Sequence, residues 1–383
     1  MGYDVTKIFQ RAPMVKLGEL LEVADEYNSN GLKLQFFGVN KDKQFMPTIA
    51  NTEGLNPTKY KIIRKNIFVF SGMQTGRDMC IRFALYTDDN PVLLSPAYTL
   101  LRVKDESIII PEYLFIYFLS SERDRLGAFY SDASVRANLE LYRFFQIEIP
   151  LPAIEVQREY VAAYRSLQQL AEQNEALAAP LQEACNAFLV KAKEKYPLEA
   201  IGSYIELDEE RNTHNKQYPF MGVDITKKIV PTSANTESLD AKKYLIVRKN
   251  KLVFSGMQTG RDIAIRIAIH ESESPVLISS AYTTFIVKDE NILLPQFLYL
   301  NFLSHEKDRI GWFYSDASVR SNLDWLRFCD IKIPLPPIEV QRSIVALYNC
   351  AEEARAIAKE AREQLKILAP AMVQRAANTP VKL

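Results

Sequence analysis

Hydrophobic residues in the first part of the chain cluster in short runs between turn-forming residues, which is the pattern of β-strands. Segments 61–70 and 79–86 alternate or cluster β-forming residues, and segment 91–104 predicts a further strand that a proline interrupts. Segment 111–121 begins with proline and is rich in aromatic residues, which predicts a short buried helix. A strand over 146–149 then closes a mixed α/β domain.

Two long segments have a different pattern, in which apolar residues recur mostly at steps of three and four. Residues 154–195 and 338–377 carry such positions among Gln, Glu, Ala and Lys, which is typical of an amphipathic helix. Pro180 and Pro370 lie inside these patterns and predict a kink or a break, because proline removes a backbone donor and clashes with the preceding turn. Each helix has one apolar face, so we expect an antiparallel pair that holds two globular domains at opposite ends.

The two halves of the chain repeat each other at a constant offset of 184 residues. Residues 71–78, Ser-Gly-Met-Gln-Thr-Gly-Arg-Asp, return unchanged as 255–262, and residues 129–136 return as 313–320. A period this long excludes a solenoid, whose repeats run to roughly 20–50 residues. The pattern predicts an α+β protein in which one unit, a domain followed by a helix, occurs twice.

The last three residues of the chain, Val381-Lys382-Leu383, repeat Val15-Lys16-Leu17 of the first unit. A third unit would thus begin where the chain stops, which favours a circular, pseudo-two-fold arrangement with neighbouring termini. The predicted boundaries are a first domain at 1–153, a helix at 154–196, a second domain at 197–337 and a second helix at 338–383.

Charge and cysteine content restrict the classes of protein. The 383 residues contain 47 basic and 47 acidic side chains, so the chain lacks the positive excess of many nucleic-acid binders, and charge alone favours an ordinary solvated surface. The four cysteines form no CxxC pair and none recurs in the other repeat, which argues against zinc and disulfides. No apolar run is long enough to cross a membrane and no signal segment begins the chain, so we expect a cytoplasmic protein with no membrane partner.

The repeated segments carry side chains suited to reading DNA. Gly72 and Gly76 allow a close backbone approach, and glutamine and arginine pair with adenine and guanine through two hydrogen bonds each. The alternative is that both segments are turns in which Asp78 and Asp132 accept hydrogen bonds from backbone amides. The candidates for DNA contact in these segments are Gln74, Thr75, Arg77, Ser134 and Arg136, with Gln258, Thr259, Arg261, Ser318 and Arg320 in the second copy. Among them, Gln74, Arg77, Gln258 and Arg261 are the candidates for base contact. The candidates for phosphate contact are Lys59, Arg64, Lys243 and Arg248 in the basic, tyrosine-bearing segments.

The sequence offers little for catalysis. The three histidines, His214, His270 and His305, pair with asparagine, tyrosine and serine in the other repeat, so none is retained. Neither a phosphate-cradling Gly-x-x-x-x-Gly-Lys loop nor a Gly-x-Ser-x-Gly elbow is present. We therefore expect no catalytic centre, no metal site and no cofactor in this chain.

Each globular unit ends in Ile-Pro-Leu-Pro and is followed by Ile-Glu-Val-Gln-Arg, at 154–158 and at 338–342, which opens a long helix. Over nearly the whole chain this arrangement resembles the specificity subunit of a Type I restriction-modification system. The resemblance implies two target recognition domains that bind double-stranded DNA, spacer helices, and no catalytic activity of its own. It also implies two methyltransferase subunits that carry S-adenosylmethionine, and restriction subunits that use ATP and Mg.

The sequence departs from that family in one respect, because its two candidate contact loops are identical, whereas family members commonly carry dissimilar domains. We therefore expect a bipartite target that is close to palindromic. Two alternatives remain open: the recognition subunit of a Type IIB-like restriction enzyme, and a two-domain scaffold that grips a protein partner.

Overall fold

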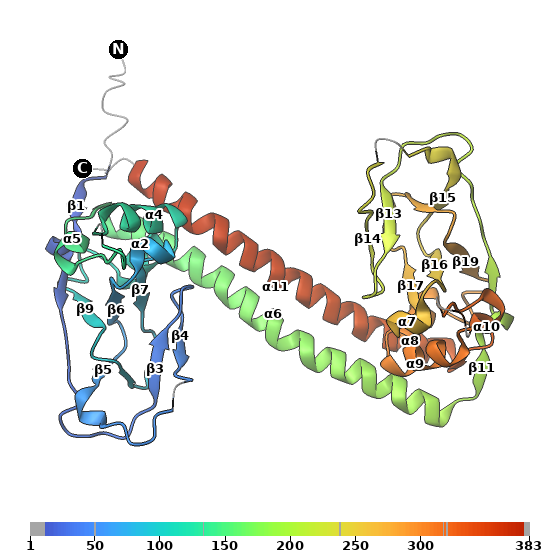
Figure 1. The fold of residues 1–383 in the computed structure, drawn as a ribbon, viewed down its shortest axis with the longest axis horizontal. Helices are drawn as coiled ribbons and strands as arrows, with labels where there is room; N and C mark the ends of the chain where they lie inside the picture. The colour runs from blue at the N-terminus through green and yellow to red at the C-terminus, as the bar shows by residue number, and fades with distance from the viewer. Residues whose placement is uncertain are drawn as a thin grey trace, which may run out of the picture. The chain divides into compact units, whose positions relative to one another are not determined.

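The computed structural model describes residues 12–49, 51–132, 134–236, 239–316, 318 and 321–378 (Figure 1). These residues form two compact units. The first comprises residues up to Asn174 together with those from Ile357 onward, and the second comprises Glu175–Ala356. The expected domain ends at 153 and 337 fall immediately before the long helices, but the compact units divide inside those helices. Each unit therefore contains one globular domain, the beginning of one long helix and the end of the other.

The globular domain of the first unit contains three small sheets. Their strand orders are β2-β9-β6-β7, β4-β3-β8-β5 and β1-β10. Strand β3 runs parallel to β8, and the other described pairings of this unit are antiparallel. The strands are β1 Met14–Lys16, β2 Leu21–Val23, β3 Phe36–Val39, β4 Phe45–Pro47, β5 Lys61–Ile63, β6 Phe68–Ser71, β7 Arg82–Leu85, β8 Val92–Leu94, β9 Thr99–Val103 and β10 Glu148–Pro150.

Short helices cover these sheets. They are α1 Leu17–Leu20, η2 Pro57–Lys59, α2 Thr75–Asp78, α3 Pro111–Tyr117, α4 Ser121–Tyr130 and α5 Leu141–Phe145, where η denotes a 3₁₀-helix. The buried helix predicted to begin at Pro111 is confirmed as α3. The strand predicted over 61–70 is two strands, β5 and β6, because Asn66 between them adopts a left-handed conformation with φ 64°.

The second unit repeats this order element by element. Its sheets have the orders β12-β19-β16-β17, β14-β13-β18-β15 and β11-β20. Its strands are β11 Leu198–Ala200, β12 Ile205–Leu207, β13 Phe220–Val223, β14 Ile229–Pro231, β15 Tyr244–Val247, β16 Leu252–Ser255, β17 Arg266–Ile269, β18 Val276–Ser279, β19 Thr283–Val287 and β20 Lys332–Pro334. Its short helices are η3 Ile201–Ser203, η5 Ala241–Lys243, α7 Thr259–Asp262, α8 Pro295–Phe302, α9 His305–Tyr314 and α10 Trp325–Cys329. The expected α+β fold with two repeated domains is confirmed.

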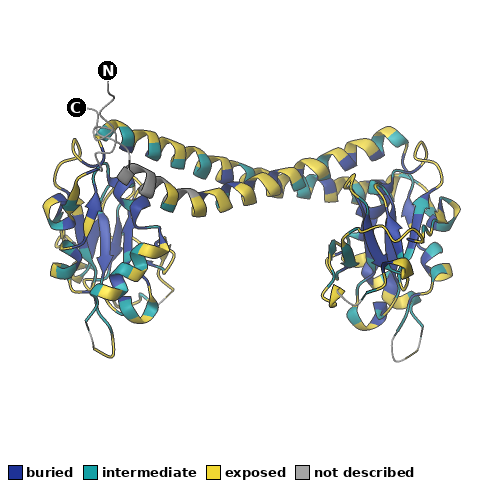
Figure 2. Ribbon diagram, turned by 90° about the horizontal axis from the view of Figure 1, so that it is seen from above, coloured by how far each residue is buried: buried dark blue, intermediate teal, exposed yellow. Residues whose placement is uncertain are grey.

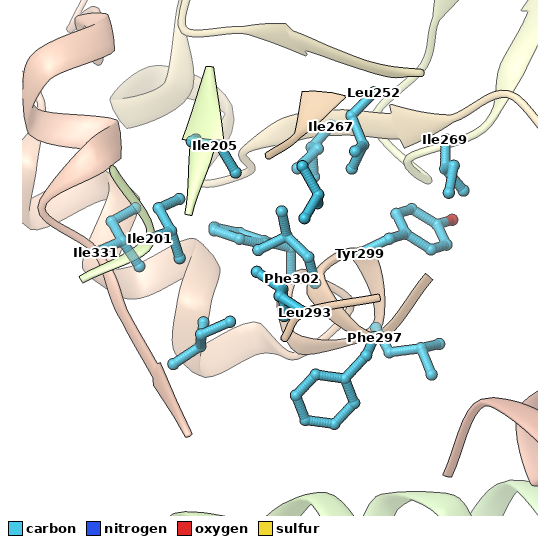
Figure 3. Close-up of a cluster of buried hydrophobic side chains, with 14 of the residues drawn as sticks. Ile201, Ile205, Leu252, Ile267, Ile269, Leu293, Phe297, Tyr299, Phe302 and Ile331 are labelled. Carbon is cyan, nitrogen blue, oxygen red and sulfur yellow. The ribbon is translucent and has the colours of Figure 1, made fainter. Parts of the chain in front are cut away.

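Each domain has a core between its sheets and its helices. In the second unit, Leu252 and Ile267 of neighbouring strands lie in one hydrophobic cluster with Phe302 of α8 (Figure 3). Burying side chains of this size stabilises the fold by about 1.5–3 kcal/mol each. These cores hold β6 and β16, at whose ends the repeated segments 71–78 and 255–262 begin. The repeated segments therefore start from fixed positions.

The two long segments form the continuous helices α6, Ile154–Lys195, and α11, Ile338–Asn378. Within each unit the two helices lie side by side and run in opposite directions (Figure 1). Of the kink or break expected at Pro180 and Pro370, a break does not occur, because both prolines lie inside continuous helices. Each proline leaves the carbonyl four residues earlier, on Ala176 or Lys366, without its usual donor, and both of these residues are exposed, so water can bind the free oxygen.

Figure 2 shows that each long helix is exposed over much of its surface and buried along part of it. The buried part includes a line of mostly small residues at intervals of seven. This line consists of Ala171, Ala178, Cys185 and Ala192 on α6, and Ile344, Ala351, Ala358 and Leu365 on α11, and Ala354 and Ala361 of α11 are also buried. A seven-residue repeat of buried positions is the signature of coiled-coil packing. Because most of these side chains are alanine, the two backbones can approach closely.

A buried glutamine fixes the start of each long helix to its domain. Gln157 is fully buried, and its Oε1 accepts a hydrogen bond from the Ile110 amide at 2.9 Å. Its Nε2 donates to the Ile108 and Pro152 carbonyl oxygens, each at 2.9 Å. Gln341 makes the equivalent three bonds in the second unit. The glutamine of the Ile-Glu-Val-Gln-Arg motif is thus an anchor whose polar atoms are satisfied inside the protein.

None of the helices in the described part of the chain combines the length and the apolar character needed to span a membrane.

Candidate nucleic-acid interface

Two segments that are distant in the sequence meet in each domain. We call residues 71–79 and 255–263 the first loops, and residues 131–139 and 315–323 the second loops. Each first loop leaves β6 or β16 and makes one helical turn, α2 or α7, bracketed by residues in the left-handed conformation, such as Gln74 with φ 58° and Met79 with φ 49°. The second loop follows α4 or α9.

Hydrogen bonds join the two loops in the same way in both units. In the first unit, the Leu139 amide donates to Gly72 O at 2.8 Å, the Gly76 amide to Ala137 O at 2.9 Å, and the Gln74 amide to Asn138 Oδ1 at 2.9 Å. In the second unit, the Leu323 amide donates to Gly256 O and the Gly260 amide to Ser321 O, both at 2.9 Å. The Gln258 amide donates to Asn322 Oδ1 at 3.0 Å. The two loops of each domain are therefore one structural unit.

The contact between the loops requires glycine. A Cβ atom placed on Gly72 would lie 1.8 Å from the Leu139 carbonyl oxygen, and one on Gly256 would lie 1.6 Å from that of Leu323. No side chain fits at such a separation. Packing thus explains why glycine is found at this position in both repeats.

Asp132 organises the second loop from within. Its Oδ1 accepts hydrogen bonds from the Ser134 hydroxyl at 2.6 Å and from the Ser134 and Asn138 amides at 3.1 and 3.0 Å. The hydrogen bond from the Ser134 hydroxyl is the largest cause that holds the pKa of Asp132 below its usual value. Asp316 and Ser318 repeat the arrangement. The turn interpretation is therefore confirmed for Asp132, and the exposed Ser134 and Ser318 already use their hydroxyl hydrogens inside the loop.

The outward face of each first loop carries Gln74 and Arg77, or Gln258 and Arg261. Arg77 Nη2 donates to Gln74 Oε1 at 2.5 Å, and Arg261 donates to Gln258 in the same way. The arginines are 57% and 60% exposed. Since the glutamine oxygen accepts from arginine, the glutamine amide hydrogens and the remaining guanidinium hydrogens are the donors for which no protein partner is described.

Asp78 holds the arginine from the other side. It pairs with Arg77 at 3.3 Å and with Arg82 at 2.7 Å, and Asp262 pairs equivalently with Arg261 and Arg266. Burial favours the neutral form of Asp78, but the hydrogen bond from Arg77 and the nearby positive charges outweigh it and lower the pKa. The aspartate therefore stays ionised and orients Arg77 beside Gln74.

Thr75 and Thr259 require a correction. Both are fully buried, and their hydroxyls donate to Gly72 O and Gly256 O at 3.0 Å. A side chain without exposed surface cannot contact a base. These threonines stabilise the first loops instead.

The basic candidates fall into two classes. Lys59 and Lys243 are exposed at the ends of η2 and η5. Arg64 and Arg248 are also exposed, but each makes two hydrogen bonds to one carboxylate, Glu26 or Glu210. Hydrogen bonding to the glutamate raises the pKa of each arginine. The negative charge of the glutamate also offsets the positive charge that the arginine could offer to a DNA phosphate.

The arginines of the second loops complete the predicted set. Arg136 is exposed, and no described acidic side chain makes an ion pair with it. Its counterpart Arg320 lies outside the described residues.

A buried ion pair that supports each site was not foreseen from the sequence. Lys43, in the turn between β3 and β4, bonds to both oxygens of Asp124 in α4 at 2.9 Å, and Asp124 also accepts from the Ile81 amide just before β7. Lys227 and Asp308 repeat the pair at 2.7–2.8 Å. The signal was present, because a lysine and an aspartate are retained at the same offset in both repeats. Their separation in sequence concealed that they meet.

No group of three or more His, Cys, Asp or Glu side chains placed to hold a metal ion occurs within the described ranges.

Comparison with known proteins gives one family. A model described as the Type I restriction modification DNA specificity domain matches the chain twice, at residues 12–181 and 201–366. No curated protein matches the chain. Among solved structures, the chain is similar to the S subunit of a Type I restriction-modification system from M. genitalium. The identity is 12%, 98% of each chain is covered and the TM-score is 0.60, which bears on the fold alone. It is also similar to the HsdS subunit from Thermoanaerobacter tengcongensis, with 17% identity, 99% of each chain covered and a TM-score of 0.42.

The two family matches each cover a domain and most of the helix that follows it, and together they span most of the chain. The paired loops recur in both matched regions. The chain therefore belongs to the Type I restriction-modification specificity family and is a sequence-specific DNA-recognition subunit.

Proposed function

We propose that the paired loops of each domain read base edges in one half of a bipartite DNA site. The observation that carries this proposal is the repeated group of Gln74, Arg77 and Asp78, returned as Gln258, Arg261 and Asp262 with the same hydrogen bonds. Arginine contributes donors that match guanine O6 and N7, and glutamine contributes amide hydrogens that match the acceptor N7 of adenine. The buried ion pairs and the glycine contact hold these donors on a rigid support, which reduces the entropy lost on binding.

Arg136 and the exposed lysines Lys59 and Lys243 are the proposed phosphate contacts. They carry charge without a described acidic partner, whereas Arg64 and Arg248 share theirs with glutamate. Phosphate contacts supply affinity and its salt dependence but no sequence information. Neutral net charge is compatible with this role, because a few unpaired cations on one face create a local positive potential.

The chain itself is proposed to be non-catalytic and cytoplasmic. In the family, catalysis belongs to the partners: two methyltransferase subunits with S-adenosylmethionine, and restriction subunits with ATP and Mg. We propose that α6 and α11 form the docking surface for the methyltransferases, because their buried line of small residues leaves exposed apolar side chains such as Leu170, Leu177, Phe188 and Ile367. Light scattering of the co-expressed complex tests this. A 2:1 ratio supports it, and a chain that stays monomeric beside a cognate methyltransferase refutes it.

Base reading is tested in two steps. Methylome sequencing of cells with and without the gene gives the target. Binding of the complex to that target and to an unrelated duplex is then compared for Arg77→Ala and Gln74→Ala. Each should lose about 1–3 kcal/mol of specific binding, with nonspecific binding nearly unchanged.

The matched controls are Lys59→Ala and Arg64→Ala. Lys59→Ala should weaken binding to both duplexes equally. It should also reduce the slope of log binding constant against log salt concentration by about one. Arg64→Ala should do so less, because Glu26 already neutralises it. If Arg77→Ala weakens binding to both duplexes alike, or if it unfolds the domain, the first loop does not read bases.

A further inference from the structure

The first eight residues of the two first loops are identical in sequence, but the surroundings of the loops differ at one aromatic position. Trp312, near the end of α9, packs against the first loop of the second unit: a methyl group placed on Gly260 would lie 3.2 Å from its Cδ1. The indole nevertheless remains 56% exposed. The equivalent residue of the first unit is Ala128. At this position, only the second unit therefore has a large aromatic ring against its first loop.

A second difference changes the same surface in the same direction. In the first unit, Lys41 places its ammonium 3.6 Å from Asp78. Its counterpart is Ile225, which is 60% exposed. At this position the first unit therefore has an ammonium group beside its first loop, whereas the second unit has an apolar side chain.

We infer that Trp312 is a specificity-determining residue that makes the second unit select thymine at a position where the first unit does not. The inference rests on the proposed base-reading function. The thymine 5-methyl is the apolar group that the major groove presents, and an exposed ring beside Gln258 and Arg261 is suited to contact it. The two half-sites are then similar in the bases read by glutamine and arginine but unequal at one thymine.

Deoxyuridine provides the test, because it differs from thymidine only by the methyl group. Each thymine of the target is replaced in turn, in both half-sites, and binding of the methyltransferase complex is measured. We expect one replacement, in one half-site only, to weaken wild-type binding about three- to fivefold, which corresponds to one buried methyl. In Trp312→Ala the same replacement should have no effect.

Two variants guard against a misfolded mutant. Trp312→Phe keeps an apolar ring and should retain the sensitivity to deoxyuridine. Ala128→Trp should create it in the other half-site. The inference is overturned if no replacement affects the wild type, or if Trp312→Ala keeps the full effect, as expected when this ring contacts a protein partner instead.

Failure of the underlying function has a different signature. A wild-type complex that binds target and unrelated duplexes equally contradicts base reading altogether. Specific binding that Arg261→Ala abolishes, together with indifference to deoxyuridine, contradicts the role of Trp312 alone.

Discussion

At the scale of single residues, Gly72 and Gly256 determine how closely the two loops of each domain approach. Their lack of a side chain allows direct backbone contact with Leu139 and Leu323, and this contact carries Gln74 and Arg77 to the surface. The site therefore depends on residues that do not touch a ligand.

Gly72→Ala should separate the loops of the first domain. The added methyl overlaps the Leu139 carbonyl, so we expect a loss of at least about 1–3 kcal/mol in the free energy of unfolding, with loss of specific DNA binding. Urea denaturation and DNA binding check both effects. Gly38→Ala is the control, because its methyl would meet only the Tyr98 hydroxyl at 3.8 Å, an ordinary contact. Equal stability of the two variants would contradict the prediction.

Lys307 is a buried lysine at the position of Arg123 in the first unit. Burial is the main cause that lowers its pKa to about 8, with a further contribution from the charge of Lys193. Between this value and the ordinary 10.5, the unfolded chain binds the extra proton and the folded chain does not. The contribution of this residue to stability therefore rises as the pH rises through that window.

Lys307→Met should remove this dependence. Chemical denaturation at several pH values from 8 to 10.5 is compared for the wild type and the variant. The difference should grow in favour of the wild type with increasing pH, by at most about 3 kcal/mol. The exposed Lys242→Met serves as the control and should leave the pH profile unchanged. A pH-independent difference for Lys307→Met would show that the buried amine does not titrate in this range.

At the scale of elements, the buried Gln157 and Gln341 attach the long helices to their domains. Gln157→Leu would leave one amide and two carbonyl groups without partners, at about 1–3 kcal/mol for each that water cannot reach. We expect a marked decrease in the urea midpoint. The neighbouring Arg158→Ala, at a position 68% exposed, should change it little. If both variants are equally stable, water replaces the glutamine and the anchor has no energetic role.

The sequence predicted the elements whose pattern is long. The amphipathic period over 154–195 gave α6 with correct ends, and the proline at 111 gave the start of α3. It could not show that the helices continue through Pro180 and Pro370, because whether a proline breaks a helix depends on the solvation of a carbonyl one turn away. The pairing of Lys43 with Asp124 and the burial of Thr75 were also missed, because both depend on tertiary contacts between distant segments.

The candidate site was predictable only in part. Because eight residues are identical in both copies, the sequence indicated the first loop and its exposed arginine with the neighbouring glutamine. Retention alone did not separate Thr75, which supports the loop, from Arg77, which faces outward. Solvent exposure makes that distinction, and it follows from the packing of α2 on α4, which no local pattern encodes.

At the scale of the whole molecule, the two domains present the same loops. Identical contact residues that read opposite strands select the same short base sequence on each strand. We therefore predict a target close to an inverted repeat, with a central spacer that the protein does not read. Methylome sequencing checks this directly. The one expected departure from symmetry is the thymine that we infer Trp312 selects in one half-site only. Two unrelated half-sites would contradict the symmetric reading, even though the family assignment would stand.

The gap should follow the length of α6 and α11 rather than the loop sequences. Removing seven residues from each helix, within the alanine-rich stretches, should shorten the gap while both half-sites persist. Removing four residues from each is the contrasting variant, because it takes the buried positions out of register and should destabilise the helix pair. An unchanged gap in the seven-residue variant would show that the helices do not measure the site.

The buried line of alanines also limits how this protein can evolve. Insertions or deletions that keep both helices in register come in steps of seven residues, or about 10 Å of helix. At about 3.4 Å per base pair, each step equals roughly three base pairs of DNA. On the proposed function, new targets can then arise in two independent ways. Exchange of loop residues changes the sequences of the half-sites, and insertion or deletion of whole heptads changes the length of the spacer between them in discrete increments.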